Sequence, residues 1–376
     1  MAKRRQNGEG TIYQRPNGLW VCEITLGYDK DNKRQKKTVS SMNLDKLKKK
    51  INDLKYLNDR KMLDAPDNIK LSEWLDFWLE TYKKGQVKPT TYDAYTGAID
   101  RYLKPLLGDT LIVKLTPIAV QKFVNELGNK GMSTAYIKKI MLVLSQAYDK
   151  AIELDKLYKN PCSNITIPKK EERKAVAFSP DEQQRFLTYC TNAESTYHNM
   201  FIFAFNTGMR LGEIQALTWD DYDAKAGTIS VTKTLVTVSN RDENAPKKQT
   251  TLLEPTPKTK SGIRKIPLNI SATQAIKNQQ EHNNIDSPFI FYSAVGTPVQ
   301  KRNIYRSFND IVKSASITSD VTFHSMRHSF ATRLIEKGAD IKTISELLGH
   351  KSIKVTLDIY SHISNDMKLK AVELLN

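Results

Sequence analysis

Residues 206–213 read Asn206-Thr207-Gly208-Met209-Arg210-Leu211-Gly212-Glu213, and an apolar run at 200–205 precedes them. The pattern predicts a buried helix that is broken at 206–208 and restarts at Arg210. Such a break points a cation out of a buried scaffold. Glu213 lies one turn beyond Arg210, at i,i+3, where its carboxylate can brace the helix end or orient the guanidinium.

The segment 324–376 contains the groups that could act with this cation. It holds four of the six histidines, the run His324-Ser325-Met326-Arg327-His328, and Tyr360, which follows His350 by ten residues. A phenol beside guanidinium and imidazole groups can break a phosphodiester bond without a metal. The phenol attacks the phosphate, and Arg and His donors stabilise the negative charge on the non-bridging oxygens. The tyrosine then holds the phosphate as a covalent ester.

Two further motifs lie between and beside these clusters. Residues 257–267 predict a tight turn between strands with a lysine near its tip, either Lys258 or Lys260. A mobile turn suits a proton donor to the leaving 5′ oxygen. Leu347-Leu348-Gly349-His350 predicts the end of a helix that starts at Asp340, with glycine in a left-handed conformation and His350 just outside the helix.

These motifs and their order resemble those of the tyrosine recombinases, also called lambda-type integrases. The resemblance covers the carboxy-terminal half closely and rests on five motifs: 207–213, the Lys-Thr-Lys turn at 258–260, 324–332, 347–350 and 358–362. Carried over residue by residue, it implies the arginines Arg210 and Arg327, the histidines His324 and His350, the acidic residue Glu213 and the nucleophile Tyr360. It places the catalytic lysine on Lys258, with Lys260 as the rival.

The implied function is a site-specific DNA recombinase, an integrase that inserts and excises a mobile element of phage or conjugative-transposon type. Tyr360 would form a 3′-phosphotyrosyl intermediate and release a 5′-hydroxyl, with His324 taking the phenol proton. One ester replaces another, so neither a cofactor nor a metal is expected, and the chain lacks a Gly-x-x-x-x-Gly-Lys-Ser/Thr phosphate loop.

Composition fits a nucleic-acid substrate. The chain of 376 residues has 58 Lys and Arg against 41 Asp and Glu, a formal net charge of +17 and a pI near 9.5. Such a charge favours polyanions and makes binding salt-dependent. The expected partner is double-stranded DNA at attachment sites. No apolar run near 18 residues and no signal peptide is present, and Cys22, Cys162 and Cys190 show no metal spacing. We therefore expect a reduced, DNA-associated protein of the bacterial cytoplasm.

The predicted fold class is multidomain α+β, with three domains. Residues 1–65 are expected to form three strands (11–14, 19–26 and 34–40) and a helix (43–61). Up to residue 60 they hold 15 Lys and Arg against 7 Asp and Glu, a net charge of +8, and this small basic sheet resembles the arm-type DNA-binding domain of some integrases. Residues 66–168 are expected to be helical and resemble the core-binding domain of the family. Residues 169–376 form a mostly helical catalytic domain with a small antiparallel sheet, after a charged linker at 167–174.

Local signals place the helices of the second and third domains. Leu71, Trp74, Leu75, Trp78 and Leu79 recur at helical spacing. Further helices are expected after Pro89, after the cap Thr116-Pro117, and from Ser133 to about 152. Ser179-Pro180-Asp181-Glu182 predicts a capping box at the start of the catalytic domain.

Two alternative functions share parts of this pattern. A type IB topoisomerase uses the same cleavage chemistry as a monomer, but the basic amino-terminal sheet disfavours it. A non-catalytic DNA-binding regulator would not need the intact set of seven residues. The recombinase would act as a homo-tetramer on DNA, and an excision factor or a host DNA-bending protein is a candidate additional partner. The tail at 365–376 predicts a short amphipathic helix that docks on a neighbouring protomer or folds back on its own domain.

Overall fold

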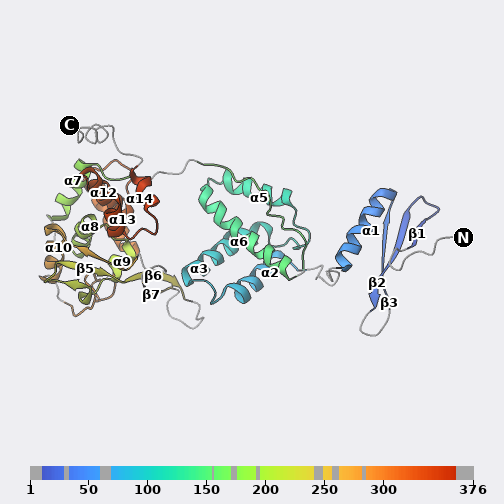
Figure 1. Ribbon diagram of the computed structural model, residues 1–376, viewed down its shortest axis with the longest axis horizontal. Helices are drawn as coiled ribbons and strands as arrows, with labels where there is room; N and C mark the ends of the chain where they lie inside the picture. The colour runs from blue at the N-terminus through green and yellow to red at the C-terminus, as the bar shows by residue number, and fades with distance from the viewer. Residues whose placement is uncertain are drawn as a thin grey trace. The chain divides into compact units, whose positions relative to one another are not determined.

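The computed structural model describes residues 11–28, 34–59, 69–154, 156–170, 176–191, 195–240, 249–255, 262–281 and 285–360 (Figure 1). The chain divides into two compact units, Met1–Glu172 and Arg173–Asn376, called here the amino-terminal and carboxy-terminal units. The predicted class, small sheets combined with mostly helical parts, is confirmed.

The amino-terminal unit begins with a small antiparallel sheet. Its strands β1 (Thr11–Gln14), β2 (Trp20–Tyr28) and β3 (Arg34–Ser41) lie in the order β1-β2-β3, and helix α1 (Leu44–Asp59) packs against β2 and β3. Cys22, Ile24, Leu47 and Ile51 form the buried cluster between sheet and helix. The three strands and the helix therefore occur where the alternation of β-rich segments and turns predicts them.

The rest of this unit, residues 69–170, is called here the helical body. Its helices are α2 (Leu71–Trp78), the π-helical turn η1 (Leu79–Lys83), α3 (Pro89–Ala98), the π-helical turn η2 (Ile99–Leu103), α4 (Lys104–Leu107), α5 (Pro117–Asn129) and α6 (Thr134–Glu153). The five residues predicted as an apolar stripe are all buried. Thr116 caps α5 as expected, and Ser133, where a helix was predicted to start, caps α6.

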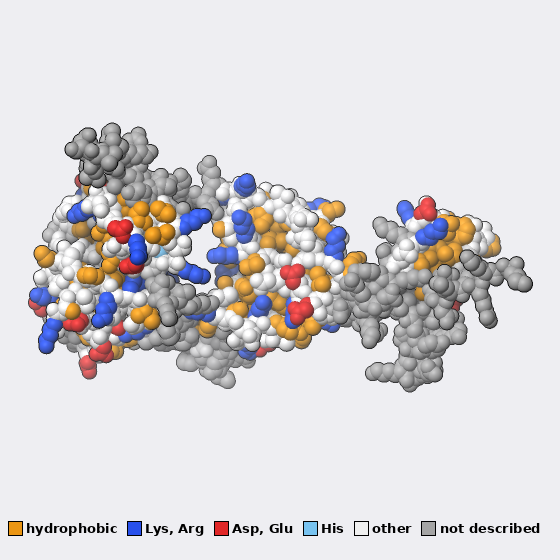
Figure 2. Space-filling model, in the orientation of Figure 1, with side chains coloured by type: hydrophobic (Ala, Val, Ile, Leu, Met, Phe, Trp, Pro, Cys, Tyr) orange, Lys and Arg blue, Asp and Glu red, His pale blue; other side chains and the backbone are white. Residues whose placement is uncertain are grey.

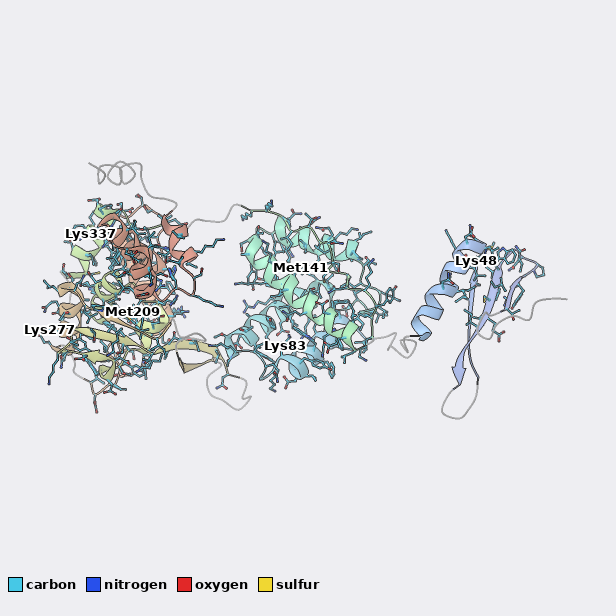
Figure 3. The ribbon with its side chains drawn as sticks, viewed as in Figure 1. Lys48, Lys83, Met141, Met209, Lys277 and Lys337 are labelled. Carbon is cyan, nitrogen blue, oxygen red and sulfur yellow. The ribbon has the colours of Figure 1, made fainter. Side chains whose placement is uncertain are left out.

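Polar atoms in this core are satisfied by backbone groups. The indole Nε1 of Trp74 donates to the carbonyl of Ala147 at 3.0 Å, and the Tyr148 hydroxyl donates to the carbonyl of Ile112 at 3.2 Å. Part of the predicted linker also packs here, since Thr134 Oγ1 donates to the Pro168 carbonyl and accepts from the Lys170 amide, both at 2.8 Å. Figure 3 shows the buried Met141 within this body.

Helices enclose the core of the carboxy-terminal unit. They are α7 (Pro180–Thr191), α8 (Thr196–Thr207), α9 (Leu211–Ala216), α10 (Ile270–Glu281), α11 (Lys301–Ser314), α12 (Phe323–Glu336), α13 (Ile341–Leu348) and α14 (Ile353–Tyr360). Edge-to-face phenylalanines dominate the core, with ring centroids of Phe178 and Phe205 5.0 Å apart. The predicted capping box is confirmed by the bonds Ser179 N to Glu182 Oε2 (3.0 Å) and Glu182 N to Ser179 Oγ (3.1 Å).

Two small antiparallel sheets complete this unit. A short 3-10 turn η3 (Trp219–Asp221) leads into β4 (Tyr222–Asp223), which pairs with β5 (Thr228–Val231), and β5 pairs with β8 (Arg264–Pro267). A separate ribbon consists of β6 (Lys233–Ser239) and β7 (Gln249–Pro255).

This topology corrects one prediction. The sequence placed 257–267 in a turn between strands, but 264–267 form strand β8. The strands on either side of Lys258 and Lys260 also pair with different partners, β7 with β6 and β8 with β5. The sequence pattern identifies strand-forming residues but contains no information on which strand each one joins.

Candidate active site

The junction between α8 and α9 positions Arg210. Gly208 ends α8 with φ +61°, and a Cβ there would lie 2.5 Å from Phe330 Cδ1, so both backbone and space require glycine. Arg210 then precedes the first turn of α9. Its amide donates to Glu213 Oε2 at 2.9 Å and its Nη1 to Oε1 at 2.8 Å. Glu213 therefore fills both roles that the sequence allowed, bracing the helix end and orienting the guanidinium.

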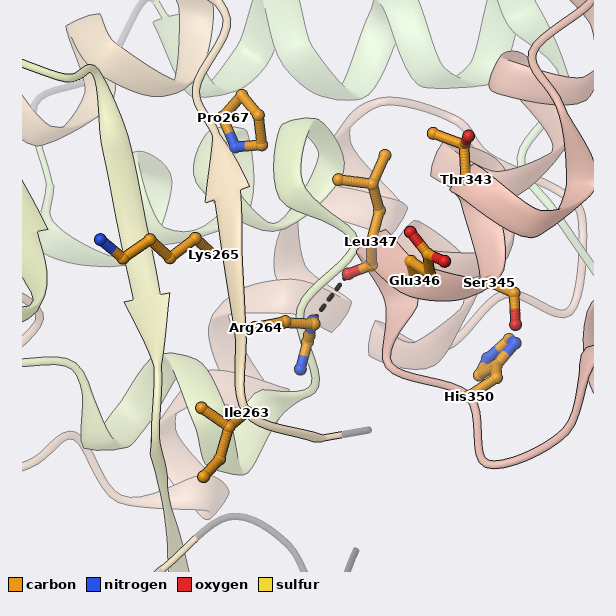
Figure 4. Close-up of a pocket in the computed structure, with 9 residues that line it drawn as sticks. All are labelled: Ile263, Arg264, Lys265, Pro267, Thr343, Ser345, Glu346, Leu347 and His350. Carbon is orange, nitrogen blue, oxygen red and sulfur yellow. Dashed lines mark hydrogen bonds between the residues drawn. The ribbon is translucent and has the colours of Figure 1, made fainter. Parts of the chain in front are cut away.

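Arg264 on β8 is the second cation on Glu213, and the sequence interpretation assigned it no role. Its Nη2 and Nη1 bond the two carboxylate oxygens at 2.8 and 3.2 Å, and its Nε donates to the carbonyl of Leu347 at 2.6 Å (Figure 4). Burial tends to raise the pKa of Glu213, but the hydrogen bonds and charges of Arg264 and Arg210 outweigh it, so that the pKa is lowered. Strand alternation could have revealed this residue, because Arg264 shares a face with the buried Ile266.

Arg327 lies in α12 and is only 4% exposed. Its Nη1 donates to the carbonyl of Gly208 at 2.8 Å and its Nη2 to that of Leu348 at 2.7 Å. The Nη2 of Arg210 donates to the neighbouring Gly349 carbonyl at 3.2 Å. Both arginines thus meet at the carboxyl ends of α8 and α13, where free carbonyls and the helix dipole favour cations.

The two predicted histidines lie beside these arginines. His324 is in the first turn of α12, and its ring meets that of His328 edge-to-face at 4.8 Å between centroids. His350 follows Gly349, which ends α13 with φ +64° as predicted, and its Nδ1 lies 2.8 Å from Thr356 Oγ1. We call Arg210, His324, Arg327 and His350 the cationic cluster.

The pKa values within this cluster indicate a surplus of positive charge. Partial desolvation, then the charges of His328, Arg327 and Arg210, lower the pKa of His324 to about 4, although much of its side chain remains exposed. Burial, then Arg327 and Arg210, lower the pKa of His350 to about 4. Burial, with Arg210 and Arg264, lowers the pKa of Arg327 to about 9. Both histidines are therefore neutral at pH 7, and the cluster favours an anion.

An open hollow lies next to the cluster, between β8 and α13 (Figure 4). Arg264 and His350 line it, together with Ile263, Lys265, Pro267, Thr343, Ser345, Glu346 and Leu347. Arg210 and Arg327 do not line this hollow.

The buried Met209, next to Arg210, lies well inside the unit, whereas Lys277 and Lys337 are on its surface (Figure 3).

Some predicted site residues lie outside the described part of the chain. Tyr360 is the last residue of α14, and its backbone alone is described. Lys258, Lys260, His362 and the tail at 365–376 fall outside the described residues. The structure thus brings together five of the predicted residues: Arg210, Glu213, His324, Arg327 and His350.

The described residues contain no group of three or more His, Cys, Asp or Glu side chains that could hold a metal ion. Within the same residues, none of the helices combines the length and apolar character needed to cross a membrane. Cys162 and Cys190 are free thiols.

Comparison with known proteins identifies the family. A model of the phage integrase family matches residues 177–367, and one of its SAM-like amino-terminal domain matches 70–128. A tyrosine recombinase XerC-like protein of Caldanaerobacter subterraneus subsp. tengcongensis is 30% identical over 94% of each chain. The chain therefore belongs to the phage integrase family of tyrosine recombinases. Within that class it is a site-specific DNA recombinase; neither a type IB topoisomerase nor a non-catalytic regulator is favoured.

Solved structures share this fold. The Tn1549 transposon integrase in complex with a circular intermediate DNA superposes with a TM-score of 0.69 at 22% identity, covering 82% of this chain and 100% of that one. A lambda integrase tetramer bound to a Holliday junction gives a TM-score of 0.61 at 20% identity, covering 95% and 96%. At such identities the likeness shows a common fold alone.

Proposed function

We propose that this recombinase integrates and excises a mobile element, with Tyr360 as nucleophile and the cationic cluster as the phosphate site. The observation that carries the proposal is the convergence of Arg210 and Arg327 on the carboxyl ends of α8 and α13, beside two histidines. Among the described residues, protein acceptors occupy only two N–H groups of Arg327. A guanidinium has five, so donors remain for a phosphate.

The chemistry is a transesterification in which bonds and protons balance. The phenol oxygen of Tyr360 forms a bond to phosphorus and the bond from phosphorus to the 5′ oxygen breaks, so the phosphate now joins the phenol oxygen to the 3′ oxygen of the DNA strand. His324, which is neutral at pH 7, accepts the phenol proton, and Lys258 donates a proton to the 5′ oxygen. Arg210, Arg327 and His350 donate to the non-bridging oxygens. Each such donor contributes about 10²–10³ in rate, and the site must lower the barrier by on the order of 20 kcal/mol.

The proposed partners are double-stranded attachment sites and three further copies of the chain. Both fold neighbours were solved on DNA, one of them as a tetramer on a Holliday junction, which supports this proposal by analogy. Lys and Arg side chains are also spread over the visible face of the helical body (Figure 2). We retain residues 1–65 as an arm-type DNA-binding domain, 66–168 as the core-binding domain and 169–376 as the catalytic domain.

The decisive experiment replaces Tyr360 with Phe. The full-length protein first selects its preferred sequence from a randomised library of duplexes. A nicked duplex with that sequence is then incubated with the protein, and the products are run on a denaturing gel. Wild-type protein should form a covalent band, and Tyr360→Phe should bind the duplex without forming one. Tyr189→Phe removes the same oxygen from an exposed tyrosine of α7 and should still give the band. A covalent band from Tyr360→Phe would refute the assignment.

The lysine assignment requires its own experiment. Lys258→Ala should slow cleavage of ordinary DNA more than Lys260→Ala does. A substrate with sulfur at the 5′ bridging position releases a thiolate that needs no proton, so it should restore cleavage by whichever variant lacks the general acid. Rescue of Lys260→Ala alone would transfer the role to Lys260.

The arm-type domain can be tested by truncation. A fragment that begins at Asn68 should still cleave core sites but lose a second class of DNA sites. The salt dependence of its binding should also be shallower, because residues 1–67, with 16 Lys and Arg against 9 Asp and Glu and so a net charge of +7, are removed. Unchanged footprints on long duplexes would argue against a DNA-binding role for these residues.

A further inference from the structure

Thr356 lies in α14, the helix that carries Tyr360, and contacts His350 of the cationic cluster. Its side chain is fully buried, unlike those of its neighbours Val355 and Leu357, which are 48% and 44% exposed. Its Oγ1 lies 2.8 Å from Nδ1 of His350. Thr356 precedes Tyr360 by four residues, about one turn of α14. One hydrogen bond therefore connects His350 to the nucleophile's helix.

The surroundings of Thr356 determine the direction of this bond. Among the described residues, Nδ1 of His350 is the one hydrogen-bond partner of Thr356 Oγ1. Thr96, Thr191 and Thr207 are helical threonines that instead donate to a carbonyl four residues earlier. If Nδ1 carried the hydrogen, the buried hydroxyl hydrogen of Thr356 would have no acceptor among these residues, which is unfavourable. The hydroxyl therefore donates and Nδ1 accepts.

A neutral imidazole carries one hydrogen, so a bond accepted at Nδ1 places that hydrogen on Nε2. We infer that Thr356 is a positioning residue that holds His350 in the Nε2–H tautomer and so makes it a hydrogen-bond donor to the scissile phosphate. The inference rests on the proposed roles of His350 and Tyr360. The Nε2–H group of His350 is fixed as a donor only when α14 lies against His350. Docking of the helix that carries Tyr360 is therefore coupled to activation of the phosphate site.

The test compares two substitutions of Thr356 with a matched control. Thr356→Val keeps the shape but removes the hydroxyl, and Thr356→Ser keeps the hydroxyl. We expect Thr356→Val to lower the covalent cleavage rate on the selected nicked duplex by about ten- to a hundredfold, as for other residues that orient a functional histidine. Binding should be unchanged, and Thr356→Ser should retain most of the rate. Thr191→Val removes a hydroxyl of α7 that donates to the Leu187 carbonyl and does not contact His350, and it should cleave normally.

Two readouts separate this role from a purely structural one. The first is the ¹⁵N spectrum of histidine-labelled full-length protein at pH 7, in which the His350 signal is assigned by its absence from His350→Ala. His350 should show the Nε2–H pattern in the wild type and in Thr356→Ser, and should lose this pattern in Thr356→Val. In a His350→Ala background, Thr356→Val should cause little further loss of cleavage. The inference would be overturned if His350 of the wild type were the Nδ1–H tautomer. It would also be overturned if Thr356→Val slowed cleavage as much in the His350→Ala background as in the wild type.

The outcomes also separate this inference from the proposed function. If the wild type forms no covalent product, the proposed function fails. If the wild type cleaves and Thr356→Val cleaves equally well, the role of Thr356 alone is refuted.

Discussion

The helical body and the carboxy-terminal unit differ in where their charged side chains lie. Among the described residues of the helical body, no Asp, Glu, Lys or Arg side chain is buried, and ion pairs such as Lys130–Glu126 lie on the surface with 57% and 46% exposure. The carboxy-terminal unit instead encloses Glu213, Arg264 and Arg327, which are 2%, 6% and 4% exposed.

The difference separates a scaffold from a reactive site. Exposed ion pairs contribute about 0–1 kcal/mol, so the helical body depends on its apolar core. Buried charges cost several kcal/mol each to desolvate, and apolar replacements are often as stable. Around Glu213 the arginines outnumber the carboxylate, which leaves net positive charge beside neutral histidines. That arrangement is unfavourable for an isolated core and favourable for a site that receives a phosphate.

Breaking the buried network of Glu213, Arg210 and Arg264 should have the largest effect on stability. Glu213→Ala leaves Arg264 and Arg210 without their shared carboxylate and should lower the free energy of unfolding by about 3–5 kcal/mol. Urea unfolding followed by circular dichroism measures the change. Glu213→Gln, which keeps the shape and some hydrogen bonds, should lose less. A loss below about 1 kcal/mol for Glu213→Ala would place this pair with the surface ion pairs.

The arginines of the cationic cluster should affect rate more than binding. Arg210→Ala and Arg327→Ala should each reduce covalent cleavage at least about a hundredfold, because each removes a donor to the developing charge. Arg185 is the matched control, since its Nη1 also bonds two carbonyls, those of Ala315 and Ser316, but at an exposed position. Arg185→Ala should cleave nearly normally. Near-normal cleavage by either cluster variant would exclude that arginine from the site.

Acid should weaken the carboxy-terminal unit of DNA-free protein. The pKa values of His324 and His350 are lowered from 6.5 to about 4 in the folded chain, so the unfolded chain binds more protons between these values. Their contribution to stability is complete above pH 6.5 and is lost as the pH falls toward 4. Thermal melts at pH 7 and pH 5 should show a decline that is smaller in a His324→Gln/His350→Gln double variant. Equal declines would contradict the lowered pKa values.

A surface pair of the helical body should give the smallest effect. Glu126→Ala removes an exposed i,i+4 partner of Lys130, and we expect a change within about 0.5 kcal/mol. Urea unfolding at low and high salt checks this expectation. A loss comparable to that of Glu213→Ala would remove the contrast between the two regions.

Local signals in the sequence were sufficient to predict much of the backbone structure around the site. The break at Gly208, the helix end at Gly349 and the capping box at Ser179 were predicted from residue types at fixed offsets, and all three are present. These features depend on backbone conformation within a few residues, which glycine and capping side chains determine directly. The motif order also indicated five residues that the fold brings together.

Contacts between distant segments were decided by the tertiary structure alone. Arg264 reaches Glu213 across 51 residues, Arg327 reaches the Gly208 carbonyl across 119, and β7 and β8 pair with different strands. The bond between Thr356 and His350 spans six residues, yet it exists only because α14 folds back beside the end of α13. The sequence by itself determined where helices start and stop and which residue types could serve a phosphate. Packing decided which of those groups meet, because burial and hydrogen bonding between segments depend on the whole fold and not on local spacing.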